Sequence, residues 1–268
     1  LNFQELISLL IGKTEYVATS QANIVKTALL ECRQKAAATL GLDKDAITVD
    51  SPVPFSLKVF ADQIDASKPS QPSKQDSHNS ILQKLEVLQN DARQRFMMTP
   101  WNETSDPFGD IVAQFMGDGD PLRIVDLSGV PNEVAGAARS AIARTLFSVK
   151  LWQSADERQT SPMLLVCEEA HRYVPNRGEA QYEAAQEAIR RLAKEGRKYG
   201  LGLMLVSQRP SEVEATVLSQ CNSWLVLRIT NDADRDHVRS ILPDSLSGLT
   251  KVLSGLRRRE AIFVGQAA

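Results

Sequence analysis

The sequence predicts an α/β protein in which a mostly parallel sheet is flanked by helices and preceded by a helical subdomain. From residue 121, short runs that are apolar throughout alternate with helix-period segments, which is typical of parallel strands buried on both faces. Before residue 121, apolar residues recur at helical spacing and strand signals are weak. The expected strands are 123–127, 163–167, 201–206, 224–229 and 261–264, and the expected helices are 132–152, 180–199, 211–219, 232–241 and 245–254.

These patterns predict two domains. Residues 1–120 would form the helical subdomain, in which the polar, proline-bearing segment 65–79 indicates a flexible linker. Residues 121–268 would form the α/β core. The charge changes at the same boundary, because residues 1–120 are net acidic and residues 121–268 are net basic.

The composition excludes several classes of protein. Of the 268 residues, 43% are hydrophobic and 24% are charged, which is close to the globular average and unlike a disordered or collagen-like chain. Three scattered cysteines indicate a reducing, cytoplasmic setting rather than a disulfide scaffold, and no apolar run is long enough for a membrane helix. A net charge of −2 means that any contact with nucleic acid would have to be a local basic patch.

Polar side chains directly follow three of the expected strands. Glu168 and Glu169 follow the strand at 163–167, Ser207 and Gln208 follow the next expected strand, and Ser128 follows the first. Ligands of parallel sheets bind beyond the carboxyl ends of the strands. The sequence therefore predicts a cleft lined by these side chains.

The adjacent acids suggest a specific chemistry. In nucleotide hydrolysis one acid orients a hydrated Mg²⁺ while another polarises the attacking water, and a nearby glutamine can contact the γ-phosphate or hold the water. The alternative is a strand that ends in an ordinary acidic helix cap. Three other motifs carry no such prediction: the Gly-Lys-Thr at 12–14 lacks the first glycine of a phosphate loop, His171 is expected to cap or pack locally, and Ser207 has no base nearby in sequence.

Three longer segments carry a family resemblance. Residues 163–175 (MLLVCEEAHRYVP), 195–213 (EGRKYGLGLMLVSQRPSEV) and 219–242 resemble the HerA/FtsK group of P-loop motor ATPases, in particular its HerA-like branch. Residues 126–131 (DLSGVP) are similar to the strand that precedes the acidic one in that branch. The resemblance implies a RecA-like core, ATP and Mg²⁺ as substrate and cofactor, assembly as a hexameric ring, and double-stranded DNA as the partner.

The resemblance also implies roles for individual residues. Glu168 would lie beside the metal and Glu169 would be the catalytic base. Gln208, together with Ser207, would contact the nucleotide, with Gln208 as the γ-phosphate sensor. Arg197 would reach the nucleotide of a neighbouring subunit and stabilise charge on the transferring phosphoryl group.

Arg172 and Arg177 follow the acid pair and are candidates for contacts with DNA phosphates, which need no sequence readout. The family's phosphate loop and its strand are expected upstream of Leu1. That strand lies between those at 201–206 and 224–229, so we expect a gap there, or closure over it, and no ATP hydrolysis by this chain alone.

The resulting prediction is the C-terminal part of a HerA-type DNA translocase or helicase that works with a nuclease or another effector enzyme, with no membrane partner. Two alternatives stay open. One is a motor of the conjugation or secretion type, and the other is a scaffold that keeps the fold without the chemistry.

Overall fold

The computed structural model describes residues 1–11, 15–93, 101, 104–117, 119–172, 174–176, 183–241 and 252–266. They form two compact units, Leu1–Ala137 and Ala138–Ala268. Three features of the sequence lie outside the described residues: the Gly-Lys-Thr at 12–14, Arg177, and most of the helix expected at 245–254.

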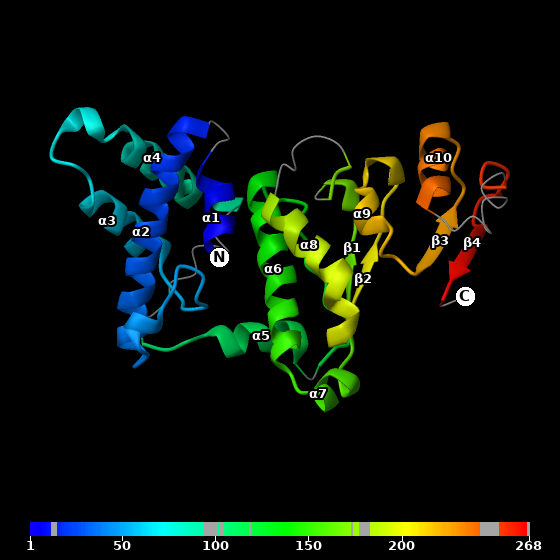
Figure 1. Ribbon diagram of the computed structural model, residues 1–268, viewed down its shortest axis with the longest axis horizontal. Helices are drawn as coiled ribbons and strands as arrows, with labels where there is room; N and C mark the ends of the chain where they lie inside the picture. The colour runs from blue at the N-terminus through cyan, green and yellow to red at the C-terminus, as the bar shows by residue number, and fades with distance from the viewer. Residues whose placement is uncertain are drawn as a thin grey trace. The chain divides into compact units, whose positions relative to one another are not determined.

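The first unit is helical (Figure 1). Asn2 caps its first helix through a capping box with Glu5, in which each side chain accepts a hydrogen bond from the other residue's backbone N–H. The segment expected as a linker at 65–79 contains the end of one helix, a short 3₁₀ turn at Pro72–Lys74 and the start of the next helix at Asp76. The helices of this unit are α1 (Phe3–Leu10), α2 (Glu15–Thr39), α3 (Leu57–Ala66), α4 (Asp76–Asn90) and α5 (Phe108–Met116).

One apolar cluster holds α1 to α4 together. Leu6, Leu29, Phe60, Ile64 and Ile81, contributed by all four helices, are each at most 1% exposed. Each such side chain stabilises the fold by about 1.5–3 kcal/mol relative to an exposed one. The apolar residues that recur at helical spacing in the sequence are therefore the residues that form this core.

The second unit alternates helices and strands. Helix α6 (Asn132–Trp152) and helix α7 (Ala155–Thr160) precede β1 (Met163–Cys167), and α8 (Glu183–Glu195) with its 3₁₀ extension Gly196–Tyr199 precedes β2 (Leu201–Leu205). The remaining elements are α9 (Ala215–Leu218), β3 (Ser223–Leu227), α10 (Asp232–Ile241) and β4 (Ala261–Gly265).

The strands form two pairs. β1 and β2 are parallel, with Met163 opposite Leu201 and Cys167 opposite Leu205. β3 and β4 are antiparallel, so the last strand departs from the expected parallel direction. No ladder joins β2 to β3 among the described residues.

Helices cover one face of each strand pair. Helix α8 packs on β2, and α10 packs on β3 and β4 through Val238, Val226 and Val264. On the other face, Leu164 is 58% exposed and Phe263 is 49% exposed. We expected strands buried on both faces, and within the described residues only one face of each is covered.

The strand expected at 123–127 was a wrong prediction. Residues 122–127 form no strand, and Ile124 is 82% exposed. A strand needs a neighbour to pair its backbone N–H and C=O groups, and this apolar segment has no ladder with any described strand.

Candidate functional site

The end of β1 turns sharply at the acid pair. Cys167 is buried, Glu168 is exposed, and Glu169 has a φ of +52°, in the left-handed region. A non-glycine residue in this region is uncommon, and such residues gather at functional sites. The turn leads directly into the 3₁₀ segment Ala170–Arg172.

The chain segments that leave β1 and β2 stay side by side. The N–H of Val206 donates to the carbonyl of Cys167 at 2.9 Å, and the N–H of Ala170 donates to the carbonyl of Val206 at 3.0 Å. Further along, the N–H of Asn176 donates to the carbonyl of Glu212 at 2.7 Å, and the N–H of Glu214 donates to the carbonyl of Val174 at 2.8 Å. We call residues 174–176 and 212–214 with these two bonds the loop ladder.

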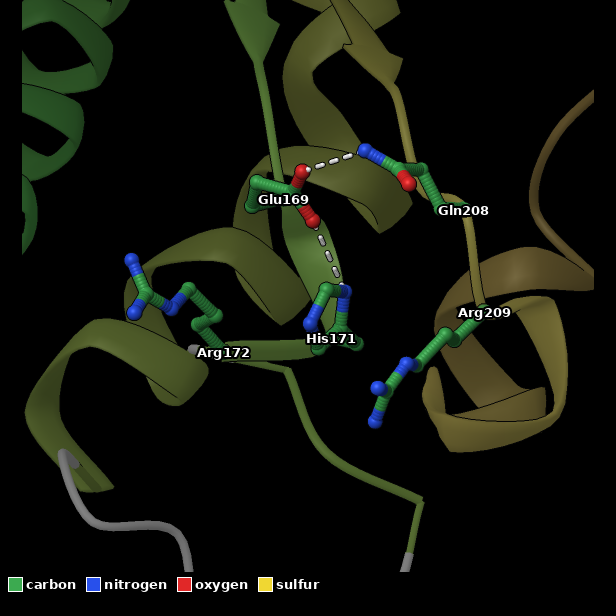
Figure 2. Close-up of a pocket in the computed structure, with 5 residues that line it drawn as sticks. All are labelled: Glu169, His171, Arg172, Gln208 and Arg209. Atoms are coloured by element: carbon green, nitrogen blue, oxygen red, sulfur yellow. Dashed lines mark hydrogen bonds and ion pairs between the residues drawn. The ribbon is translucent and has the colours of Figure 1, made fainter.

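This pairing brings the predicted acid and amide into contact. Figure 2 shows Nε2 of Gln208 donating to Oε1 of Glu169, at 3.0 Å. The two residues are 39 positions apart in sequence. Of the residues expected to line one cleft from three strand ends, the structure thus brings Glu169 and Gln208 into direct contact.

His171 is a residue that the sequence reasoning missed. Its Nδ1 lies 3.3 Å from Oε2 of Glu169 and 3.2 Å from Oγ of Ser207 (Figure 2 shows the contact with Glu169). We expected His171 to cap a helix or pack locally, and the structure places it against both strand ends. Its spacing of two from Glu169 gave no signal, because the left-handed turn that folds it back is not visible in the sequence.

Ser207 therefore has an imidazole beside it in space, although the two residues are 36 positions apart in sequence. The arrangement is still not that of a serine hydrolase, in which opposite nitrogens of the histidine contact the serine and the acid. Here the same atom, Nδ1, contacts both. Oγ of Ser207 also accepts the backbone N–H of Arg209 at 3.1 Å.

A pocket of about 420 Å³ opens over these groups. Its lining residues are Glu169, His171, Arg172, Gln208 and Arg209 (Figure 2). Two guanidinium groups and an amide donor suit an anionic ligand such as a phosphate. Of the two guanidinium groups, that of Arg209 also pairs with Glu212, at 2.9 Å.

The other predicted site residues do not line this pocket. Glu168 is exposed on the strand tip, and Ser207 contacts two pocket residues, His171 and Arg209, without lining the pocket itself. Arg197 lies before β2, at the opposite end of that strand from Gln208, and its Nη1 donates to Oε1 of Gln266 at 3.3 Å. Arg172, predicted to contact DNA, is the exception, because it lines the pocket.

The residues at the tip of β1 fit a magnesium ion whose other ligands come from substrate phosphates and water. Within the described part of the chain, no three His, Cys, Asp or Glu side chains are grouped as a metal site. Mg²⁺ usually binds through one or two carboxylates, substrate phosphates and water. The exposed carboxylate of Glu168 would supply an oxygen ligand of that kind.

Comparison with a solved structure defines the class of fold. The chain is similar to VirB4 of Thermoanaerobacter pseudethanolicus, with a TM-score of 0.63 and 17% identity, over 99% of this chain and 65% of that one. The chain thus shares the fold of VirB4, with a parallel strand pair and flanking helices.

The family follows from the sequence comparisons. The model of the helicase HerA central domain matches residues 1–146, more than half of the chain, and the chain belongs to this family. The match includes the helical half of the chain. It ends before the segments at 163–175, 195–213 and 219–242, on which the resemblance was based.

The relatives are archaeal proteins. The DNA double-strand break repair helicase HerA of Pyrococcus furiosus is 41% identical over 106 residues, which are 40% of this chain and 19% of that protein. HerA of Sulfolobus acidocaldarius is 29% identical over 161 residues, 59% of this chain and 31% of that protein. The alignments thus span between about a fifth and a third of these relatives.

One further comparison concerns membranes. Among the helices in the described ranges, none combines the length and the apolar character needed to span a bilayer.

Proposed function

We propose that this chain is part of an ATP-driven DNA translocase or helicase of the HerA type, in which hydrolysis moves double-stranded DNA through a hexameric ring. One observation carries the proposal: Glu169 and Gln208, from the tips of two parallel strands, meet over a pocket suited to an anion. Membership of the HerA central-domain family supports it. In this proposal residues 121–268 are the C-terminal part of the core, and residues 1–120 are the helical insertion.

The proposed reaction assigns each residue of the site a task. Glu169 takes a proton from the attacking water, and Gln208 contacts the γ-phosphate. Glu168 orients the hydrated Mg²⁺, and Ser207 contacts the nucleotide. Mg²⁺ bound there would neutralise charge that develops on the phosphoryl oxygens.

Arg197 is proposed to act on a neighbouring subunit. It lies at the opposite end of β2 from Gln208, so it does not serve the pocket of its own chain. A ring would bring such a residue to the next subunit's nucleotide, where a guanidinium stabilises the transition state. Arg172 and Arg177 are proposed to contact DNA phosphates, and a nuclease or other effector enzyme in the cytoplasm is the proposed partner.

The test is DNA-stimulated ATP hydrolysis by the full-length protein. The variant Glu169→Gln keeps the shape of the side chain but cannot accept a proton, and we expect turnover to fall at least 100-fold with ATP binding retained. The matched control is Glu187→Gln, because Glu187 is an exposed acid on α8 away from the pocket. Undiminished turnover in Glu169→Gln would contradict the proposal.

A conjugation or secretion-type motor is the second candidate, and the likeness to the VirB4 structure is compatible with it. The two candidates differ in their response to DNA. Turnover that rises severalfold with double-stranded DNA favours the HerA-type motor, whereas turnover indifferent to DNA favours the second. A protein that binds no nucleotide at all would be a scaffold.

A further inference from the structure

Both carboxylate oxygens of Glu169 have a partner in this structure. Oε1 accepts from the amide of Gln208, and Oε2 faces Nδ1 of His171. With its hydrogen on Nδ1, His171 can donate toward Oε2 of Glu169, 3.3 Å away, as well as toward Oγ of Ser207, 3.2 Å away. The proposed base is therefore held from two sides by side chains from two strand ends.

The two partners differ in how firmly they are held. The side chain of His171 is only 17% exposed, and its Nδ1 also lies within hydrogen-bond distance of Ser207. Ser207 is itself fixed by the backbone N–H of Arg209. Gln208 borders the open pocket and has Glu169 as its partner there.

This difference gives the two contacts different roles when a phosphate enters the pocket. The amide of Gln208 can turn from Oε1 toward the phosphate, because it lies at the pocket wall. The imidazole of His171 stays in place, because Ser207 holds it on the side of β2. Oε1 is then exposed to the pocket while Oε2 remains tethered.

We propose that His171 is a positioning residue that holds Glu169 in its productive orientation through Nδ1, an inference that rests on the proposed ATPase function. The water oxygen forms a bond to the γ-phosphorus, and the bond from that phosphorus to the bridging oxygen breaks with its electron pair leaving on ADP. The water proton passes to Oε1 of Glu169. His171 exchanges no proton with substrate and acts only through Glu169.

Three variants of the full-length protein test the role of Nδ1. Asparagine can place an amide N–H where Nδ1 stands, whereas glutamine places one where Nε2 stands. In DNA-stimulated ATP hydrolysis we expect His171→Ala and His171→Gln to lower kcat about tenfold or more, with KM for ATP changed less than twofold. We expect His171→Asn to restore most of kcat. Equal losses in all three variants, or no loss in any, would overturn the proposal.

Glu169→Gln in the same assay separates the two hypotheses. If it abolishes turnover while the His171 variants behave like the wild type, the positioning role fails and the ATPase proposal stands. If Glu169→Gln has full turnover, the ATPase proposal itself fails.

A spectroscopic test needs no turnover. The chain contains three histidines, so ¹⁵N-histidine labelling gives few imidazole signals, and His171→Asn assigns the one that matters. We expect the Nδ1–H tautomer at His171 in the 268-residue chain, and its loss in Glu169→Ala. An Nε2–H tautomer at His171 in the wild type would overturn the proposal.

Discussion

Glu169 pairs a costly backbone conformation with a tightly held side chain. Its left-handed φ of +52° costs about 1 kcal/mol for a residue with a β-carbon. The adjacent Glu168 is not among the described residues with a positive φ. The two neighbouring glutamates thus differ in backbone as well as in surroundings, and this difference can be measured.

Replacing alanine by glycine should have opposite effects at these two positions. At residue 169, glycine relieves the left-handed strain, so we expect E169G to be about 1 kcal/mol more stable than E169A. At residue 168, glycine only adds freedom to the unfolded chain, so E168G should be about 0.5–1 kcal/mol less stable than E168A. Urea unfolding of the four variants measures both differences. If the glycine variant were more stable, or less stable, than the alanine variant at both positions, the backbone strain at Glu169 would be contradicted.

His78 predicts a dependence of stability on pH. Burial, and secondarily the charge of Lys68, lower the pKa of His78 below its usual 6.5. The unfolded chain therefore takes up a proton at a higher pH than the folded chain. Stability that depends on neutral His78 is complete above pH 6.5 and is lost as the pH falls through the lowered pKa.

We therefore expect His78→Leu to gain stability relative to the wild type as the pH falls from 7.5 to 5. Chemical denaturation at several pH values measures this difference. A difference that stays constant over this range would show that His78 does not carry the effect.

At the scale of elements, several helices and four of the five expected strands lie close to the ranges predicted from the sequence. Helices α6 and α10 occupy the ranges expected from the sequence, 132–152 and 232–241, because a helix satisfies its hydrogen bonds within one segment. The apolar run at 123–127 reads as a strand but forms none. A strand depends on a partner elsewhere in the chain, which its own sequence does not contain.

The same reasoning explains what could be predicted of the site. Glu169 and Gln208 were found because each follows an apolar strand. The place of His171 depends on the register of β1 against β2 and on the turn at Glu169, and neither is encoded in a short motif. The place of Arg172 on the pocket wall was not predicted for the same reason, since only the fold puts it there.

A buried lysine ties α6 to the segment before β1. Lys150 is fully buried, and its Nζ donates to the carbonyl and hydroxyl of Ser161 and to Oε1 of Gln153. Lys150→Met would remove the hydrogen bonds that this charged donor makes to Ser161 and Gln153, so we expect a loss of about 1.5–3 kcal/mol in the free energy of unfolding. Lys194→Met, on the exposed last turn of α8, should change it by less than about 0.5 kcal/mol.

At the scale of the whole molecule, the second unit presents apolar sheet faces to solvent. Leu164 and Val166 on β1 are 58% and 48% exposed, and Leu225 on β3 is 59% exposed. Contiguous exposed apolar surface of this kind binds hydrophobic dyes and promotes association. The opposite face of β1, which includes Leu165, is less exposed.

We therefore expect the 268-residue chain to bind the dye ANS, and the double variant L164T/V166T to reduce that binding at little cost in stability. Leu165→Thr, on the other face of the same strand, should lower the free energy of unfolding without reducing dye binding. Fluorescence titration and urea unfolding of the same samples check both parts. Equal dye binding by the wild type and the double variant would contradict the exposed face.

The loop ladder joins the two segments that leave the pocket. Val174 and Asn176 are hydrogen-bonded to the stretch that begins four residues after Gln208, so the two stretches form one stiff arm. Residues 174–176 are therefore held by backbone hydrogen bonds beside the segment that follows Gln208, so the two stretches are expected to move together.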